Sequence, residues 1–389
     1  MRPGKLEDEF QKLKGRCNYY FSKFSAEPLS SPEHVYFSLT NRCNLKCRMC
    51  DVKDYPSQVK DELTTEKCEE IIDEIIGMNI NHLVFSGGEP LLRDDIFHLI
   101  EYAVAKKIKT VDVITNGILI NEEIAHKLIK SGINHITFSV DGFQEANDAI
   151  RGQGSFRVVM EAIDLINKYK EDCRFPTIAI NFTIMNQNID DILPMIELAR
   201  EKKCNRILFQ PVLFSNTDMH ARLKKSELWV NSEILPKLKR VMENLIEEQK
   251  SQRDLLIDVD RKILEMIPGY FSGELLAEGA KCYEGIIRIV ISYNGDLWSC
   301  MGVYGSLKEN SLKQCWFSKK TISIRNKARN CQTPCLQGCV HFFGGSDIYS
   351  QVKEFINLIK LSNEPCYHSL LLEMLEDYRR LIHNNIYKF

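Results

Sequence analysis

Short apolar runs alternate with longer amphipathic segments between about residues 34 and 275. The short runs are rich in β-branched and aromatic residues, which is typical of strands buried in a sheet. Six strands are predicted in this part of the chain, at residues 35–39, 82–85, 110–114, 135–140, 177–182 and 206–209.

The segments between these runs carry apolar residues at helical spacing. The first helix is expected to begin near Thr64 or Thr65 and to end at Gly77. Its apolar positions from Cys68 to Ile76 share one face. Further helices are predicted near residues 94–106, 121–131, 155–170 and 189–202. Sequential right-handed βα crossovers build a parallel sheet, and six units favour an α/β fold with an open, partial (β/α)6 TIM-like barrel.

The chain divides into four predicted parts. Residues 1–34 form an N-terminal extension, residues 35–275 the barrel, residues 276–345 a smaller cysteine-rich α+β domain, and residues 346–389 a helical tail. A long charged helical region is predicted at about residues 223–264, near the end of the barrel part. In the third part, Asn294-Gly295 between two apolar runs predicts a β-hairpin.

Polar and glycine-containing runs follow the predicted strands, and ligands of such barrels bind at the carboxyl ends of the strands. We therefore expect a ligand-binding rim formed by Gly87, Gly88, Glu89, Pro90, Thr115, Asn116, Ser139, Asp141, Asn181 and Gln210. Two glycines let a backbone approach a ligand closely, and Glu89-Pro90 fixes the direction of its carbonyl groups. Arg151 can pair with a ligand carboxylate through two hydrogen bonds. For Thr115, Asn116, Asn181 and Gln210, an ordinary strand-end hydrogen-bonding role is the alternative.

The charge and the missing motifs exclude several classes of function. The 389 residues include 51 basic and 53 acidic side chains, which give a net charge of -2. This charge does not indicate binding to nucleic acid or to an anionic membrane. Neither a targeting segment nor a stretch of 18 apolar residues is present, and we expect a cytoplasmic protein without a membrane partner. No phosphate-binding or dinucleotide-binding glycine motif occurs.

Three of the fourteen cysteines, Cys43, Cys47 and Cys50, directly follow the first predicted strand. Cysteines bunched in this way in a reducing compartment favour metal ligation over disulfides. A structural zinc site or an ordinary electron-transfer cluster uses four protein ligands. Three closely spaced thiolates therefore suggest an iron-sulfur cubane with one iron left open for a small molecule.

The run from Thr40 to Cys50 resembles the signature of the radical S-adenosylmethionine (SAM) superfamily, and the match extends to Gly87-Gly88-Glu89-Pro90. The resemblance implies that Cys43, Cys47 and Cys50 hold a [4Fe-4S] cluster whose open iron binds SAM. Reduction then yields methionine and a 5′-deoxyadenosyl radical. Ser139 and Asp141 suit the ribose or methionyl group, and Arg151 lies in a segment that looks like the one carrying a carboxylate-binding arginine in related enzymes.

A second cysteine group resembles the auxiliary-cluster domain called SPASM or, in a shorter form, twitch. Its members are Cys282, Cys300, Cys331, Cys335 and Cys339. The last three have CX3CX3C spacing, whereas the full family pattern has CX2CX5CX3C. The resemblance implies one auxiliary [4Fe-4S] cluster, held by Cys282, Cys300 and at least two of the other three. Four thiolates would suit tetrahedral zinc equally well.

Together these features predict a radical SAM enzyme, of oxidoreductase or maturase type, that abstracts hydrogen from an unactivated carbon. Its substrate would be a small metabolite or a peptide or protein, and the outcome an oxidation, an epimerisation or a cross-link. A reducing donor such as flavodoxin or ferredoxin is implied. The short N-terminal extension slightly favours a small-molecule substrate, or a protein substrate that binds without a leader-binding domain. The alternative is a non-catalytic scaffold that binds zinc or clusters.

Overall fold

The computed structural model describes residues 5–22, 28–170, 173–212, 226–251, 254–275, 282–336, 352–353, 356–357 and 365–386. Its centre is one sheet with the strand order β10-β9-β8-β1-β2-β3-β4-β5-β6-β7. The strands are β1 His34–Thr40, β2 His82–Gly87, β3 Thr110–Thr115, β4 His135–Ser139, β5 Thr177–Ile184, β6 Arg206–Pro211, β7 Leu256–Ile257, β8 Arg288–Ile291, β9 Asp296–Ser299 and β10 Gly302–Ser306.

Strands β1 to β7 run parallel, which confirms the six predicted strands and adds the short β7. The sheet stays open, as expected for a partial barrel. The predicted hairpin at Asn294-Gly295 is confirmed as the antiparallel pair β8–β9. Beyond the prediction, β8 also pairs in parallel with β1. The cysteine-rich part of the chain therefore extends the barrel sheet on the β1 side.

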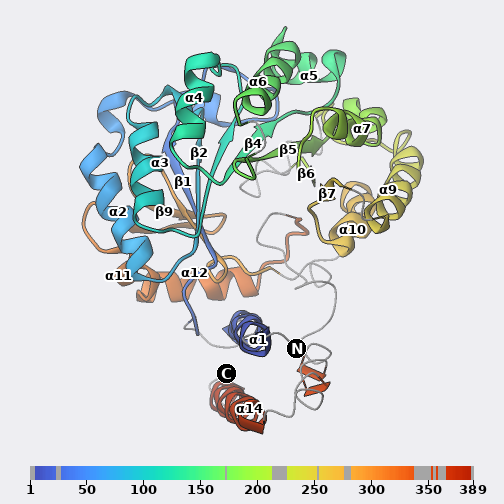
Figure 1. Cartoon of the computed structure of the whole chain (residues 1–389). Helices are drawn as coiled ribbons and strands as arrows, with labels where there is room; N and C mark the ends of the chain where they lie inside the picture. Colours follow the sequence, from blue (N-terminus) through green and yellow to red (C-terminus); the bar gives the residue numbers. More distant parts are fainter. Residues whose placement is uncertain are drawn as a thin grey trace.

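Helices follow the strands and cover the outer side of the sheet (Figure 1). The helices that connect the strands of the barrel are α2 Thr65–Gly77, α3 Ile96–Ala105, α4 Glu122–Lys130, α5 Gln144–Arg151, α6 Ser155–Lys170, α7 Pro194–Glu201, α9 Leu235–Lys250 and α10 Arg261–Ser272. The 3-10 helices are η1 Val52–Asp54, η2 Val59–Asp61, η3 Pro90–Leu92 and η4 Asn186–Asp191. The remaining helices are α1 Lys5–Ser22, α11 Leu312–Trp316, α12 Lys319–Arg329 and α14 Pro365–Ile386.

The ends and the buried face of α2 follow from its sequence. The Thr64 side chain accepts a hydrogen bond from the Lys67 amide and caps the start of α2. The side chains of Cys68, Ile71, Ile72 and Ile75 are fully buried against the sheet. The predicted start near Thr64, the end at Gly77 and the apolar face are all confirmed.

The two faces of the sheet differ because successive side chains of a strand point to opposite sides. In β1, Val35 and Phe37 are buried in the main hydrophobic core, whereas His34, Tyr36 and Ser38 are only half-buried. The same alternation holds in β6, where Arg206, Leu208 and Gln210 are half-buried. In β1 and β6, one face therefore carries the core, and the other stays partly accessible.

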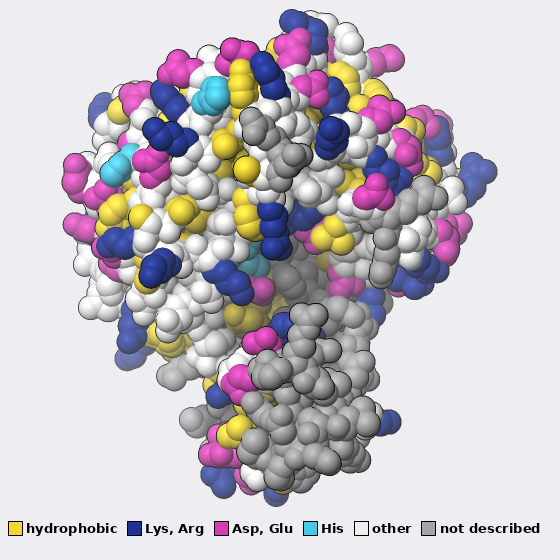
Figure 2. Space-filling model, viewed as in Figure 1, with side chains coloured by type: hydrophobic (Ala, Val, Ile, Leu, Met, Phe, Trp, Pro, Cys, Tyr) yellow, Lys and Arg dark blue, Asp and Glu magenta, His cyan; other side chains and the backbone are white. Residues whose placement is uncertain are grey.

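The N-terminal helix α1 packs on the C-terminal helix α14, and both lie below the barrel in Figure 1. The Phe21 and Tyr378 rings stack with centroids 4.4 Å apart, and the Tyr378 hydroxyl donates to Asn18 Oδ1 over 2.6 Å. Basic and acidic side chains are interspersed on the face shown in Figure 2. In the part of the chain that the structure describes, no helix is long and apolar enough to span a membrane.

Candidate active site

The loop from Asn41 to Asp51, here called the cysteine loop, connects β1 to η1 and carries Cys43, Cys47 and Cys50. The Cys47 side chain is 8% exposed, and the other two are half-buried. Burial raises the pKa of Cys47 to about 11, Arg151 opposes this, and the nearby Cys50 and Cys43 thiols add to it. The three thiols are therefore close enough to interact electrostatically.

Within the described residues, no three His, Cys, Asp or Glu side chains stand in a ready-made metal-binding arrangement. The three thiols are free of disulfides, and burial favours their protonated form. Metal binding requires thiolates, so cluster assembly would have to release their protons. The ligand role of Cys43, Cys47 and Cys50 remains a prediction at this point.

The two glycines at the end of β2 hold the start of the cysteine loop. The Gly88 amide donates to the Thr40 carbonyl over 2.7 Å, and the Glu89 amide donates to the Arg42 carbonyl over 2.8 Å. A Cβ on Gly88 would lie 2.1 Å from the Arg42 oxygen, and one on Gly87 would lie 2.3 Å from the Thr40 oxygen. The backbone of Thr40 and Arg42 therefore comes so close that only glycine fits at positions 87 and 88. The sequence did not predict this contact.

Glu89 is fully buried and joins the ends of β2 and β3. Its carboxylate accepts hydrogen bonds from Thr115 Oγ1 and the Asn116 amide, each over 2.8 Å, and burial raises its pKa despite these donors. The Glu89 and Pro90 carbonyls accept hydrogen bonds from Leu92 and Arg93 within the η3 turn. Glu89, Pro90 and Thr115 thus already have partners within the protein, and direct ligand contact by this run stays a prediction.

Asn116 reaches from the end of β3 to the cysteine loop. Its side-chain amide donates to Asn44 Oδ1 over 2.7 Å, and its nitrogen lies 3.8 Å from Cys43 Sγ. Its own oxygen accepts the Ile118 amide. The predicted rim residue therefore lies beside a predicted cluster ligand.

Arg151 and Asp141 form a buried ion pair next to the cysteine loop. Arg151 Nε lies 2.7 Å from Asp141 Oδ2, although neither atom has a hydrogen-bond partner of good geometry. Burial alone would lower the pKa of Arg151, but Asp141 and the Cys47 and Cys50 thiols raise it. The other Asp141 oxygen accepts the Thr183 amide over 2.7 Å. A permanent positive charge is therefore held beside two of the three thiols.

The other predicted rim residues meet on neighbouring strands. Ser139 at the end of β4 is opposite Asn181 of β5, and Thr183 of β5 is opposite Gln210 of β6. All four side chains are half-buried. The structure therefore brings Ser139 and Gln210 near the strand ends, as the sequence predicted, whereas Asn181 lies inside β5 opposite Ser139.

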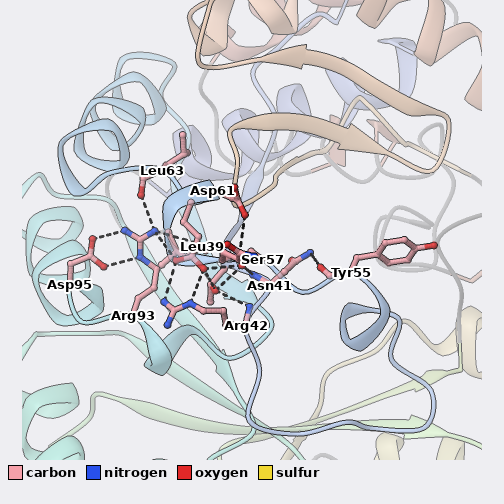
Figure 3. Close-up of polar contacts among 12 residues, drawn as sticks. Leu39, Asn41, Arg42, Tyr55, Ser57, Asp61, Leu63, Arg93 and Asp95 are labelled. Carbon is pink, nitrogen blue, oxygen red and sulfur yellow. Dashed lines mark hydrogen bonds and ion pairs between the residues drawn. The ribbon is translucent and has the colours of Figure 1, made fainter.

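A buried polar network around Glu62 anchors the start of the cysteine loop and was missed by the sequence analysis (Figure 3). The Glu62 carboxylate accepts hydrogen bonds from Arg42 Nε and Ser57 Oγ, each over 2.9 Å, and from the Thr40 hydroxyl. The Ser57 hydroxyl also accepts the Asn41 amide. No sequence signal identifies this network, because its members lie on separate segments.

Arg93, which directly follows η3, connects this network to the start of α3 and to the segment before α2. Its guanidinium donates to Asp95 over 2.8 and 2.6 Å and to the carbonyls of Leu39 and Leu63. It also lies 3.8 Å from Glu62. Figure 3 shows the Arg93 guanidinium between Asp95 and the carbonyl groups of Leu39 and Leu63. The buried Arg93 guanidinium therefore connects the end of β1, where the cysteine loop begins, to Leu63 and to Asp95.

We expect Glu62→Gln to destabilise the protein by about 3 kcal/mol at pH 7, because two arginines lose a buried partner. Burial alone would raise the pKa of Glu62, but the donors from Arg42, Thr40 and Ser57 lower it overall. The stabilisation is therefore complete above the unfolded-state pKa and is lost as the pH falls through the folded-state pKa. Urea denaturation at pH 7 and pH 4 measures both effects.

The control for this prediction is Glu123→Gln, which removes an exposed ion pair with Lys127. It should leave the denaturation midpoint unchanged, because exposed pairs are screened by solvent. Equal midpoint shifts in the two variants would contradict the anchoring role of Glu62.

The second cysteine group is spread over several elements. Cys282 lines a small cavity with Glu284, Arg325 and Arg329, and Cys331 follows the end of α12. Cys335 lies near α10, where its thiol contributes to the raised pKa of Tyr270.

Cys300 directly follows β9, and Cys339 lies outside the described residues. These positions leave an auxiliary cluster as a prediction. Among the cysteines outside both groups, Cys315 is buried in the core and Cys173 is exposed.

Comparison with known families and curated proteins gives one consistent result. Residues 37–208 match the family model described as the Radical SAM superfamily. Fe-coproporphyrin III synthase of Methanosarcina barkeri is 31% identical over 232 residues, which cover 59% of this chain and 52% of that protein. Mycofactocin maturase MftC of Mycolicibacterium smegmatis is 34% identical over 172 residues, covering 44% of this chain and 42% of that protein. The chain thus spans about half the length of the curated relatives it matches.

Solved structures support the same fold. Streptococcus suis SuiB bound to S-adenosylmethionine has a TM-score of 0.61 at 16% identity, covering 79% of this chain and 73% of that one. The enzyme anSMEcpe with bound AdoMet has a TM-score of 0.59 at 18% identity, covering 91% of this chain and 98% of that one. Residues 37–208, which run from β1 to β6, therefore form a domain of the radical SAM superfamily.

Proposed function

We propose that this protein cleaves SAM reductively at a [4Fe-4S] cluster held by Cys43, Cys47 and Cys50, and abstracts a hydrogen atom from a C–H bond of its substrate. The observation that carries this proposal is the placement of the three thiols. They share one loop at the carboxyl ends of the parallel strands, beside the buried Arg151 guanidinium.

Three thiols on one loop would supply the three protein ligands of such a cluster. When bound, such a cluster supplies the electron that splits the sulfonium of SAM and leaves a 5′-deoxyadenosyl radical. The chain contributes thiolates, and Arg151 provides a positive charge that favours the thiolate form of Cys47 and Cys50. The backbone of Gly88 and Glu89 holds the loop from the β2 side.

The cofactor contacts proposed for SAM are Gly87, Gly88, Glu89, Pro90, Thr115, Asn116, Ser139, Asp141, Arg151, Asn181 and Gln210. The strongest support lies at Arg151 and Asp141, where two buried polar atoms lack a hydrogen bond of good geometry. A cofactor with carboxylate and hydroxyl groups would supply such partners. Ser139 and Asn181, neighbours on β4 and β5, would bind on the same accessible face.

We further propose a peptide substrate, with a small metabolite as the alternative class. Structures with this fold include SuiB bound to the precursor peptide SuiA, and one curated relative is named a maturase. The small-molecule alternative is favoured by a different relative, which is named a synthase of Fe-coproporphyrin III. A ferredoxin or flavodoxin would deliver the electron. An auxiliary cluster would draw on Cys282, Cys300 and at least two of Cys331, Cys335 and Cys339.

Anaerobic reconstitution tests this function. The expected product is a brown protein that, after reduction with dithionite and addition of SAM, forms 5′-deoxyadenosine and methionine in equal amounts, as measured by liquid chromatography and mass spectrometry. A colourless protein that binds zinc and yields neither product would support the scaffold alternative instead. A protein that binds clusters but yields no 5′-deoxyadenosine would also contradict the proposal.

A further inference from the structure

Lys53 in η1 lies against the half of the cysteine loop that carries the second and third thiols. Its ammonium group donates to three carbonyl oxygens of this loop, those of Cys47 over 3.1 Å, Arg48 over 3.3 Å and Cys50 over 2.5 Å. The Cys50 amide also donates to the Cys47 carbonyl over 3.2 Å. The turn between these two cysteines is therefore closed by its own backbone and by one lysine.

Lys53 is exposed, and its charge opposes the rise in the pKa of the Cys50 thiol that burial and the neighbouring Asp51 carboxylate cause. No carboxylate in the described ranges lies within ion-pair distance of its ammonium group, whereas the second cation beside the loop, Arg151, is paired with Asp141. The Arg48 side chain of the same loop is paired with Glu227. Lys53 therefore adds a positive charge at the Cys47–Cys50 turn that is not held in an ion pair, although Asp51 opposes its effect on Cys50.

We propose that Lys53 is a positioning residue that fixes the Cys47–Cys50 turn and, through its unpaired charge, makes the bound cluster easier to reduce. This inference rests on the proposed function. Reduction adds one electron, and so one negative charge, to a cluster already held by three thiolates. A nearby cation stabilises the reduced form more than the oxidised form, and hydrogen bonds and charge are known means of setting cluster potentials.

The test compares three variants of the full-length, reconstituted protein. Lys53→Met removes both the donors and the charge, Lys53→Gln keeps a donor without the charge, and Lys53→Arg keeps both. The control is Lys60→Met, because Lys60 is exposed in η2 and makes no hydrogen bond or ion pair among the described residues. Iron and sulfide content, the thermal midpoint and the midpoint potential of the cluster are measured for each protein.

The potential is obtained by redox titration with dithionite, followed by electron paramagnetic resonance. The relevant signal is the one that changes when SAM is added, which separates it from any auxiliary cluster. We expect Lys53→Met to weaken reduction about tenfold, a shift of about 59 mV to more negative values for one electron. Lys53→Gln should give a similar shift, and Lys53→Arg and Lys60→Met should stay near the wild-type potential.

A Lys53→Met protein with normal iron content and an unchanged potential would overturn the inference and leave the proposed function intact. An equal shift in Lys60→Met would also overturn it, because any lost charge would then have the same effect. Loss of iron in Lys53→Met at an unchanged thermal midpoint, restored by Lys53→Arg, would support the positioning role. A wild-type protein that takes up no iron would overturn both the inference and the proposed function.

Discussion

Replacing Cys47 with alanine is expected to abolish the formation of 5′-deoxyadenosine. Cys47 is the most buried of the three thiols and lies between the other two in the loop. Two remaining thiolates cannot hold a cubane that leaves only one iron open. The iron content should therefore fall by about four atoms per chain, and product should be undetectable after reduction in the presence of SAM.

The matched control is Cys173→Ala. Its thiol is exposed and distant in sequence from both cysteine groups, so the variant should keep the iron content and the product yield of the wild type. Iron that remains in the Cys47 variant would report an auxiliary cluster in the C-terminal part. Continued product formation by the Cys47 variant would refute the ligand assignment.

Replacing Gly88 with alanine should destabilise the protein strongly, although it leaves every cysteine in place. The new methyl group would lie 2.1 Å from the Arg42 carbonyl oxygen, a backbone atom that cannot rotate away. The cysteine loop must then move from the end of β2, and the hydrogen bonds from Gly88 and Glu89 are lost. We expect a destabilisation of about 3 kcal/mol by urea denaturation, together with poor cluster assembly.

Gly77→Ala is the control for this prediction. Gly77 ends α2, and a Cβ at this position would meet no atom within 4 Å. Alanine favours a helix more than glycine does, so this variant should be as stable as the wild type or slightly more stable. A Gly88→Ala protein with wild-type stability and iron content would show that the close contact between β2 and the cysteine loop is not required.

The barrel could be predicted from sequence because its signals are local. The β-branched runs that became β1 to β6, and the apolar face of α2, depend on residues a few positions apart. The sequence also predicted Ser139 and Gln210 near the strand ends, because parallel strands end at one edge, whereas Asn181 lies inside β5 opposite Ser139. What it missed depends on long-range pairing. The addition of β8 beside β1 and the packing of α1 on α14 leave no comparable local pattern.

In the candidate site, too, local sequence signals were predictive and long-range contacts were not. Its residues were identified, but several of their partners were not. Arg151 and Asp141, expected to face a ligand separately, pair with each other, and the Glu89 carboxylate joins β2 to β3. Glu62 and Arg93, which anchor the cysteine loop, carried no signal because charged residues at such positions usually face solvent. Only the three-dimensional arrangement shows that they are buried.

The most direct measurement of the central claim uses SAM labelled with 15N at its amino group. Electron-nuclear double resonance of the dithionite-reduced protein detects whether that nitrogen is bound to iron. We predict a strong 15N coupling in the wild type that is absent from Cys47→Ala, because the open iron exists only when Cys43, Cys47 and Cys50 hold the cluster. A reduced cluster that binds SAM without this coupling, or a coupling that persists in Cys47→Ala, would contradict the account.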